Sequence, residues 1–123
     1  MGLDVYIYSA KKDKNAPEIV RGQYMWGDLK LEAYWRKNYL INSFFGDIYF
    51  SKEKENPDFN GVYIRLTLQD IRKLKEAVKK CSDESWEGNS LDRNRYPTIR
   101  VLRKLLAEME ANPDRIYYGL GSW

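Results

Sequence analysis

One stretch of the chain, EAYWRKNYLINSFF at residues 32–45, combines the side-chain types that can bind a nucleotide. Cationic side chains hold phosphate groups, aromatic rings stack on a base, and amide groups can read the polar edges of that base. The stretch supplies all three kinds, in Tyr34, Trp35, Arg36, Lys37, Asn38 and Asn42.

A second group with the same chemistry lies farther along the chain. Arg93 and Arg95 belong to the polar segment 82–96, which also contains Trp86 and Tyr96. Long loops of this kind in a compact domain often carry function. Further candidates are Arg65 for phosphate, and Tyr118 and Trp123 for stacking.

The possible enzymatic chemistry is narrowed by the residue types that the sequence lacks. The chain has no histidine and one cysteine, which excludes His-dependent nucleophiles, His-containing zinc sites and an intramolecular disulfide. Asp4, Glu32 and Asp47 can in principle hold Mg²⁺ or Mn²⁺, but their spacing does not require it. We therefore expect a protein that is not an enzyme and holds no metal or cofactor. A carboxylate-metal phosphodiesterase is the least favoured alternative.

The bulk composition is that of a globular domain. Hydrophobic residues make up 43% and charged residues 32% of 123 residues, so we expect one domain spanning residues 1–123. Aromatic residues reach 15%, which fits either a ring-rich core or a recognition surface. The net charge of +3 is too small to predict binding to duplex nucleic acid. No segment reaches the roughly 20 apolar residues of a membrane span, which favours a cytoplasmic protein without membrane contact.

Three segments have the pattern of strands. Residues 3–9, LDVYIYS, alternate apolar residues with polar and aromatic ones, which predicts a strand with an aromatic second face. Residues 62–66, VYIRL, and the terminal RIYYGLGSW are also expected to be strands, the last one pairing near the first. Residues 18–28 fit a short strand or an ordered loop.

Three segments have the pattern of helices. The first is expected from residue 29 or 30 to Phe45, with Asp28 as N-cap and Gly46 as its end. The second follows Thr67, with Asp70 in a capping box, and ends near Cys81. The third begins near Pro97, and its apolar face consists of Ile99, Leu102, Leu105, Leu106 and Met109.

These elements predict an α+β fold, with a small, mostly antiparallel sheet that includes both termini and packs against about three helices. The first helix should pack on this sheet. A sheet with few strands has exposed edges, so we also expect a homodimer or a larger homo-oligomer.

Helical spacing would place several residues of the opening stretch on one face, namely Leu31, Tyr34, Trp35, Asn38, Ile41, Asn42 and Phe45. Two asparagines would then interrupt an apolar stripe. They either fasten a neighbouring loop or line a binding site. On the flank, Glu32 and Arg36 would form an i,i+4 pair worth roughly 0.2–0.5 kcal/mol.

Three segments resemble a family of small proteins encoded by bacteriophages and prophages. The opening MGLDVYIY resembles that family's M-G-L-D-M-Y-L, YWRKNYLIN resembles Y-W-R-K-x-N-x-I-H, and YYGLGSW resembles an aromatic run closing with S-W. The resemblance points to Asp4, Tyr34, Trp35, Arg36, Lys37, Ile41 and Trp123. The family's asparagine falls on Tyr39 and its histidine on Asn42, and an Asn cannot exchange a proton near neutral pH. The family implies no established activity.

The resemblance leads to a functional hypothesis. Phages carry small proteins that defeat bacterial defences, and several such defences use diffusible nucleotide signals. We expect a counter-defence protein in the cytoplasm of the infected host that binds and sequesters such a signal without cleaving it. The alternative is an inhibitor that binds a host defence enzyme through its aromatic surface.

Overall fold

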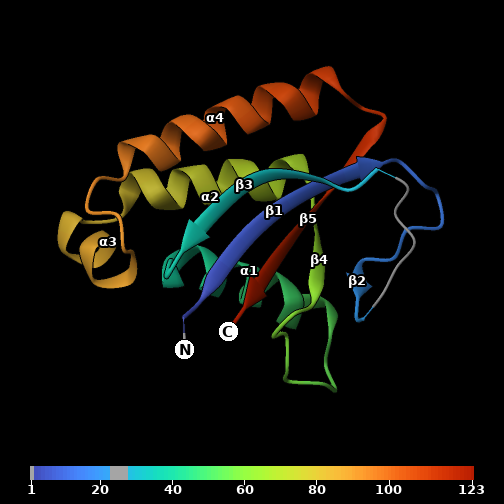
Figure 1. Ribbon diagram of the computed structural model, residues 1–123, viewed down its shortest axis with the longest axis horizontal. Helices are drawn as coiled ribbons and strands as arrows, with labels where there is room; N and C mark the ends of the chain where they lie inside the picture. Colours follow the sequence, from blue (N-terminus) through green and yellow to red (C-terminus); the bar gives the residue numbers. More distant parts are fainter. Residues whose placement is uncertain (1, 23–27) are drawn as a thin grey trace.

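The computed structural model describes residues 2–22 and 28–123, and its framework is one antiparallel sheet of five strands (Figure 1). The strands are β1 (Asp4–Lys11), β2 (Ile19–Val20), β3 (Lys30–Arg36), β4 (Tyr63–Leu66) and β5 (Arg115–Ser122). Their order across the sheet is β2-β4-β5-β1-β3, and every neighbouring pair is antiparallel. Both terminal strands therefore lie in the same sheet, which confirms the predicted α+β class and the pairing of β1 with β5.

The described part of the chain contains four helices, where the sequence predicted about three. They are α1 (Tyr39–Lys52), α2 (Leu68–Lys80), α3 (Asp83–Asn89) and α4 (Tyr96–Ala111). Helices α2 and α4 are confirmed, together with the residues that predicted where they begin. Thr67 and Asp70 form the capping box of α2, and Pro97 stands in the first turn of α4. No helix among the described residues is long and apolar enough to cross a membrane.

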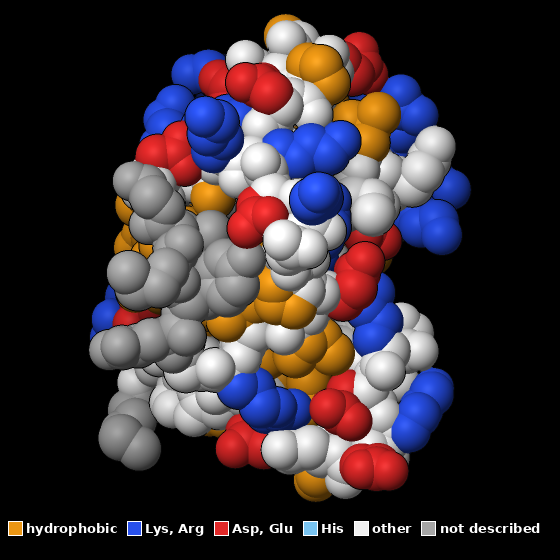
Figure 2. Space-filling model, turned by 90° about the vertical axis from the view of Figure 1, so that its right-hand side faces the viewer, with side chains coloured by type: hydrophobic (Ala, Val, Ile, Leu, Met, Phe, Trp, Pro, Cys, Tyr) orange, Lys and Arg blue, Asp and Glu red, His pale blue; other side chains and the backbone are white. Residues whose placement is uncertain are grey.

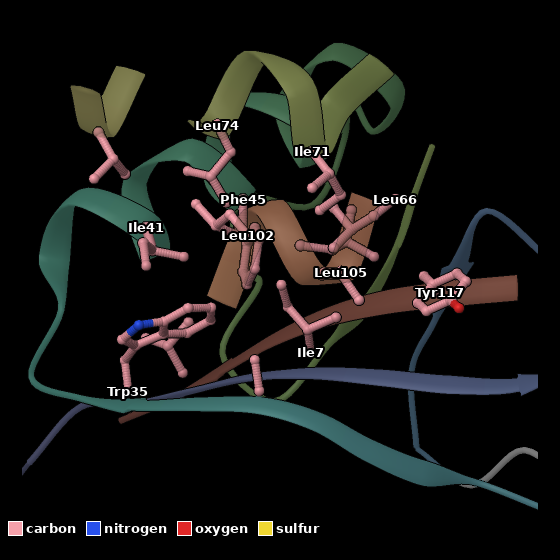
Figure 3. Packing of buried hydrophobic residues seen from close by; sticks show 14 of the residues in the cluster. Ile7, Trp35, Ile41, Phe45, Leu66, Ile71, Leu74, Leu102, Leu105 and Tyr117 are labelled. Carbon is pink, nitrogen blue, oxygen red and sulfur yellow. The ribbon is translucent and has the colours of Figure 1, made fainter. Parts of the chain in front are cut away.

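The hydrophobic core lies between one face of the sheet and helices α1, α2 and α4 (Figure 3). Because successive side chains of a strand point to opposite faces, Ile7 of β1 and Trp35 of β3 point into this core. They meet apolar side chains of the helices, and Figure 3 shows Ile41, Phe45, Ile71, Leu74, Leu102 and Leu105. The opposite face of the sheet has a smaller cluster around Tyr118, formed with residues 10–20 and Ile116.

The predicted helix at 29–45 is wrong in its first half, because residues 30–36 form the edge strand β3. Ala33 and Trp35 are buried while Tyr34 and Arg36 are exposed, which is the period of two of a strand. The chain then turns at Lys37, whose φ of 54° lies in the left-handed region, and α1 begins after Asn38. The residues expected on one helical face are thus divided between two elements.

Three predictions that depended on a helix over residues 29–45 are also wrong. The i,i+4 pair of Glu32 and Arg36 does not form, because both residues lie on a strand, where residues four apart do not meet. Glu32 accepts a hydrogen bond from the Ser9 hydroxyl at 2.6 Å instead. Asp28 is not an N-cap, and its carboxylate accepts from the backbone N–H of Lys11 at 2.7 Å. Gly46 lies inside α1, where an added Cβ would stand 2.9 Å from the Phe59 ring.

The polar segment 82–96, expected as a loop, contains helix α3. Ser82 caps it by accepting a hydrogen bond from the N–H of Ser85, and Trp86 is buried in the main core. The sequence of residues 18–28 fits either a short strand or an ordered loop. Ile19–Val20 form β2, and residues 23–27 lie outside the described residues.

The packing of α1 against β5 requires a residue without a side chain at position 119, which is Gly119. An added Cβ at Gly119 would lie 2.7 Å from the Phe45 ring, which is itself fully buried. We expect Gly119→Ala to lower the free energy of unfolding by about 1–3 kcal/mol through overpacking, measured by denaturant titration.

Gly88→Ala is the matched control, because an added Cβ there meets no atom within 4 Å. It should be neutral or slightly stabilising, since Ala is the better helix former. Equal effects of the two substitutions would contradict the described packing of α1 on β5.

Candidate functional site

The segments MGLDVYIY, YWRKNYLIN and YYGLGSW contribute three neighbouring strands of the sheet. Asp4 of β1 stands opposite Arg36 of β3 on one side and Ser122 of β5 on the other. Two residues farther on, Tyr6 stands opposite Tyr34 and Leu120 in the same way. Because residues directly opposite share a face, side chains from distant parts of the chain meet on one surface.

That surface is the sheet face turned away from the helices, and it carries five tyrosines. We call it the tyrosine face, made of Tyr6, Tyr8, Tyr34, Tyr63 and Tyr118. The rings form a continuous series with centroid separations of 5.1 Å for Tyr34–Tyr6, 5.6 Å for Tyr6–Tyr8, 6.0 Å for Tyr8–Tyr63 and 6.5 Å for Tyr63–Tyr118. The series is half-exposed at Tyr34 and fully buried at Tyr118.

The exposed end of the tyrosine face is organised by the carboxylate of Asp4. It accepts a hydrogen bond from the Tyr34 hydroxyl at 2.5 Å and one from Arg36 Nη1 at 3.5 Å. The Arg36 guanidinium in turn lies against Gly2, where an added Cβ would be 2.7 Å from Nη2. A side chain at position 2 would displace the end of the flexible Arg36 side chain.

The local environment raises the pKa of two phenols of this face, Tyr8 and Tyr34. The hydrogen bond to Asp4 raises the pKa of Tyr34, and burial followed by the neighbouring Tyr63 and Tyr6 raises the pKa of Tyr8. At neutral pH both hydroxyls are therefore hydrogen-bond donors. The face offers rings and O–H donors, and its exposed end adds the half-exposed guanidinium of Arg36 beside the Asp4 carboxylate.

Of the residues predicted for a binding site, Tyr34 and Arg36 lie together on the tyrosine face, and Tyr118 lies at its buried end. The Tyr118 hydroxyl donates to the carbonyl of Pro17 at 2.7 Å. Trp35 points to the opposite side of the sheet, where its indole N–H donates to Thr98 Oγ1 at 3.0 Å.

Lys37 and Asn38 form the turn between β3 and α1. The Lys37 backbone N–H donates to the carbonyl of Leu3 at 2.6 Å, and the Lys37 side chain is exposed. Asn38 is fully buried and caps α1 by accepting from the N–H of Ile41 at 2.9 Å, while its amide nitrogen reaches Ser90 at 3.4 Å. The asparagine thus fastens a neighbouring loop, the simpler of its two interpretations.

Asn42 and Trp123 lie near each other on the helix side of the C-terminal strand. Asn42 Oδ1 is buried beside Gly121, and no partner for it exists among the described residues. The Trp123 ring packs edge-on against Phe59 at 4.9 Å, and the Asn60 side chain binds the Trp123 backbone at both N–H and carbonyl.

Arg65 lies on β4 opposite Tyr118, and two further predicted residues lie on the segment between α3 and α4. Arg95 pairs with Asp83 at 3.2 Å, and Arg93 is exposed to solvent. Neither belongs to the tyrosine face. The acidic residues considered for a metal do not gather either. Within residues 2–22 and 28–123 no group of three or more carboxylate or cysteine side chains could hold an ion.

Tyr6, Tyr8 and Tyr63 belong to the face but not to the predicted site, although for Tyr6 and Tyr8 the sequence contains the necessary signal. The alternation in LDVYIYS places Tyr6 and Tyr8 on the face opposite to Val5 and Ile7. The sequence could not show that β4 would place Tyr63 in the same series. Comparison of the chain with protein-family models, curated proteins and solved structures finds no match.

The hydrogen bond between Tyr34 and Asp4 makes a prediction about pH. A raised pKa means that folding favours the protonated phenol, a contribution present below the ordinary pKa and lost as pH rises through the raised one. Asp4→Asn removes the largest cause, so the pKa of Tyr34 should fall towards its ordinary value. Ring-proton NMR shifts of Tyr34, followed through alkaline pH, measure this directly.

The pKa of Tyr8 serves as the internal control, because its main cause is burial and not Asp4. A Tyr34 titration that is identical in the parent chain and in Asp4→Asn would contradict the described hydrogen bond.

Proposed function

We propose that this chain is a phage-encoded counter-defence protein that binds a nucleotide-derived immune signal on the tyrosine face and holds it without cleaving it. The single observation that carries the proposal is the continuous series of tyrosine rings on the helix-free side of the sheet, with Arg36 at its exposed end. The resemblance of three segments to phage-encoded proteins supports the biological setting.

The rings provide the means of binding a base. Each base has a π-face, and stacking of a base on an aromatic side chain contributes about 1–3 kcal/mol. Tyr34 is 47% exposed, so its ring is accessible, and Tyr6 and Tyr8 continue the series inward. The protonated hydroxyls add donors for ring nitrogens or carbonyl oxygens of the base.

Arg36 provides the means of binding phosphate. Its side chain is 51% exposed, and its contact with Asp4 at 3.5 Å is long for a charge-assisted hydrogen bond. A guanidinium has five N–H donors, so a phosphate could be bound without breaking the contact with Asp4. Asp4 partly neutralises the charge of Arg36. The face therefore favours a ligand that has a ring to stack on the tyrosines as well as a negative charge.

Binding without turnover is supported by the chemistry of the face. Raised phenol pKa values make Tyr8 and Tyr34 poor general bases near neutral pH, and the chain contains no histidine to replace them. The alternative, an inhibitor that binds a host protein, uses the same surface, because tyrosine is enriched in protein interfaces. Analysis of the bound fraction and of the heat-released ligand, after incubation with a panel of cyclic and linear nucleotides, separates these outcomes.

Tyr34→Ala tests the proposal with a matched control. Loss of one stacking ring should weaken binding of a nucleotide from the panel by roughly 5- to 150-fold. Tyr39→Ala removes a ring of similar exposure, 52%, from the start of α1, away from the tyrosine face, and should leave binding unchanged. Isothermal calorimetry measures both.

Arg36→Ala separates binding from stability in the same assay. The half-exposed contact with Asp4 should be worth only about 0.5 kcal/mol of stability, while loss of a phosphate contact costs about 1.5–3 kcal/mol of binding. Arg36→Lys should restore binding only in part, because an ammonium cannot make the bidentate contact.

Equal losses of binding in Tyr34→Ala and Tyr39→Ala would refute a site on this face.

We also propose that two copies associate through the outer edge of β3, which places their tyrosine faces side by side. β3 ends the sheet, and in the described part of the chain its outer edge has no backbone hydrogen-bond partner. Light scattering should give about twice 14.6 kDa. Antiparallel pairing about Ala33 sets Lys30 against Arg36 of the second copy, so salt should strengthen the dimer. A monomer at all accessible concentrations contradicts the proposal.

A further inference from the structure

The accessible rings of the tyrosine face extend beyond the area of one nucleobase. Three of them follow one another from the edge of the sheet inward, with centroid separations of 5.1 Å for Tyr34–Tyr6 and 5.6 Å for Tyr6–Tyr8. Tyr34 is 47% exposed, and Tyr6 and Tyr8 are partly exposed. A single base stacked on Tyr34 would therefore leave the two rings of β1 uncovered.

The inner end of the ring series is covered by the chain itself. Tyr118 is fully buried, its hydroxyl donates to the carbonyl of Pro17 at 2.7 Å, and its ring packs in a cluster with apolar side chains of residues 10–20. Tyr63 packs against the same cluster, and Arg65 of β4 stands opposite Tyr118 at this covered end. The rings open to a second base are therefore the two on β1.

Positive charge beside the accessible rings lies at their outer end. Arg36 is two residues from Tyr34 on β3 and on the same face, about 7 Å along the strand. Lys37 follows in the turn and is exposed, while the Asp4 carboxylate offsets part of the charge. Charge of this size suits one phosphate group next to the base that stacks on Tyr34.

The charge on the neighbouring surface does not suit a long polynucleotide. Figure 2 shows the end of the molecule near β2, where the Lys and Arg side chains of the described residues are mixed with Asp and Glu and with apolar side chains. A long single strand binds along a positively charged groove that follows its backbone. The tyrosine face is therefore suited to a short ligand whose affinity comes mainly from stacking.

We propose that the ligand of the tyrosine face is a dinucleotide, with two bases joined through phosphate in a linear or a cyclic molecule. This ligand class rests on the proposed function of the same face. One base stacks on Tyr34 and the second on the rings of Tyr6 and Tyr8, while Arg36 holds a phosphate at the outer end. Aromatic side chains on an antiparallel sheet are known to stack two or three bases in this way.

A length series tests this ligand class with the folded full-length chain. Adenosine monophosphate, linear adenylates of two to four units with a terminal phosphate, and the cyclic adenylate dimer are titrated by calorimetry, and the series is repeated with uracil as the base. We expect a dimer to bind roughly 5- to 150-fold more tightly than the monophosphate, because the second base adds a stacking contact. Longer adenylates should gain less than about threefold more, because no further ring is open to them.

The linear and cyclic dimers distinguish the two forms of the ligand. Tighter binding of the cyclic dimer assigns a cyclic ligand, and tighter binding of the linear dimer assigns a linear one. Salt gives a second readout, because each phosphate held contributes roughly −0.7 to the slope of the logarithm of the association constant against the logarithm of salt concentration. We expect about this one-phosphate slope for the dimers and for the longest adenylate alike. A slope that steepens with each added unit would overturn the dinucleotide assignment.

Tyr8→Leu tests the place of the second base. Leucine keeps an apolar side chain on β1 and removes the ring, so the advantage of a dimer over the monophosphate should fall from roughly 5- to 150-fold to less than about twofold. Tyr6→Leu is a second variant with the same expected result. Tyr96→Leu is the control, because that ring is 67% exposed at the start of α4, away from the tyrosine face. It should keep the full advantage, and thermal melts verify that all three variants are folded.

The outcomes separate this ligand class from the proposed function. Dimers that bind no more tightly than the monophosphate, with both weakened by Tyr34→Ala, would overturn the dinucleotide assignment and leave the proposed function standing. An equal loss of the dimer advantage in Tyr8→Leu and Tyr96→Leu would also overturn it. Failure of every member of both series to bind would refute the proposed function as well.

Discussion

Strand β1 lies between β3 and β5 and pairs with both of them. Hydrogen bonding on both edges fixes the register, and with it the face to which each side chain points. The side chains of Val5 and Ile7 therefore point into the core beneath the helices, and those of Tyr6 and Tyr8 point to the other side of the sheet. A slip of one residue would exchange these roles, so the core and the tyrosine face are specified together.

At the exposed end of the tyrosine face, a few residues connect β1 to β3. Asp4 joins Tyr34 and Arg36, while the carbonyl of Leu3 receives the N–H of Lys37 in the turn that leads into α1. The same few residues close the β1–β3 edge and set the polarity of the surface. A half-neutralised guanidinium beside protonated phenols suits a ligand with both an aromatic ring and a negative charge.

Much of the fold was predictable, because its strongest signals are local. Thr67 with Asp70 and Pro97 mark helix starts whose apolar stripes continue without interruption. Residues 29–45 were misassigned because a strand followed by a helix can imitate helical spacing. Asn38 is a favoured N-cap residue and was the one local sign of the boundary. Tyr34 and Arg36 were identified from their chemistry, whereas Tyr63 required the order of the strands, which no local pattern contains.

We propose that the tyrosine face binds a ligand through its rings. Aromatic-proton NMR spectra of the chain, recorded while each member of a panel of cyclic and linear nucleotides is added, test it most directly. For at least one nucleotide, we expect the signals of Tyr6, Tyr8 and Tyr34 to shift together and saturate, while those of Tyr39 and Tyr96 on the helices do not. Saturating shifts confined to Tyr39 and Tyr96, or no saturating shift with any nucleotide, would contradict it.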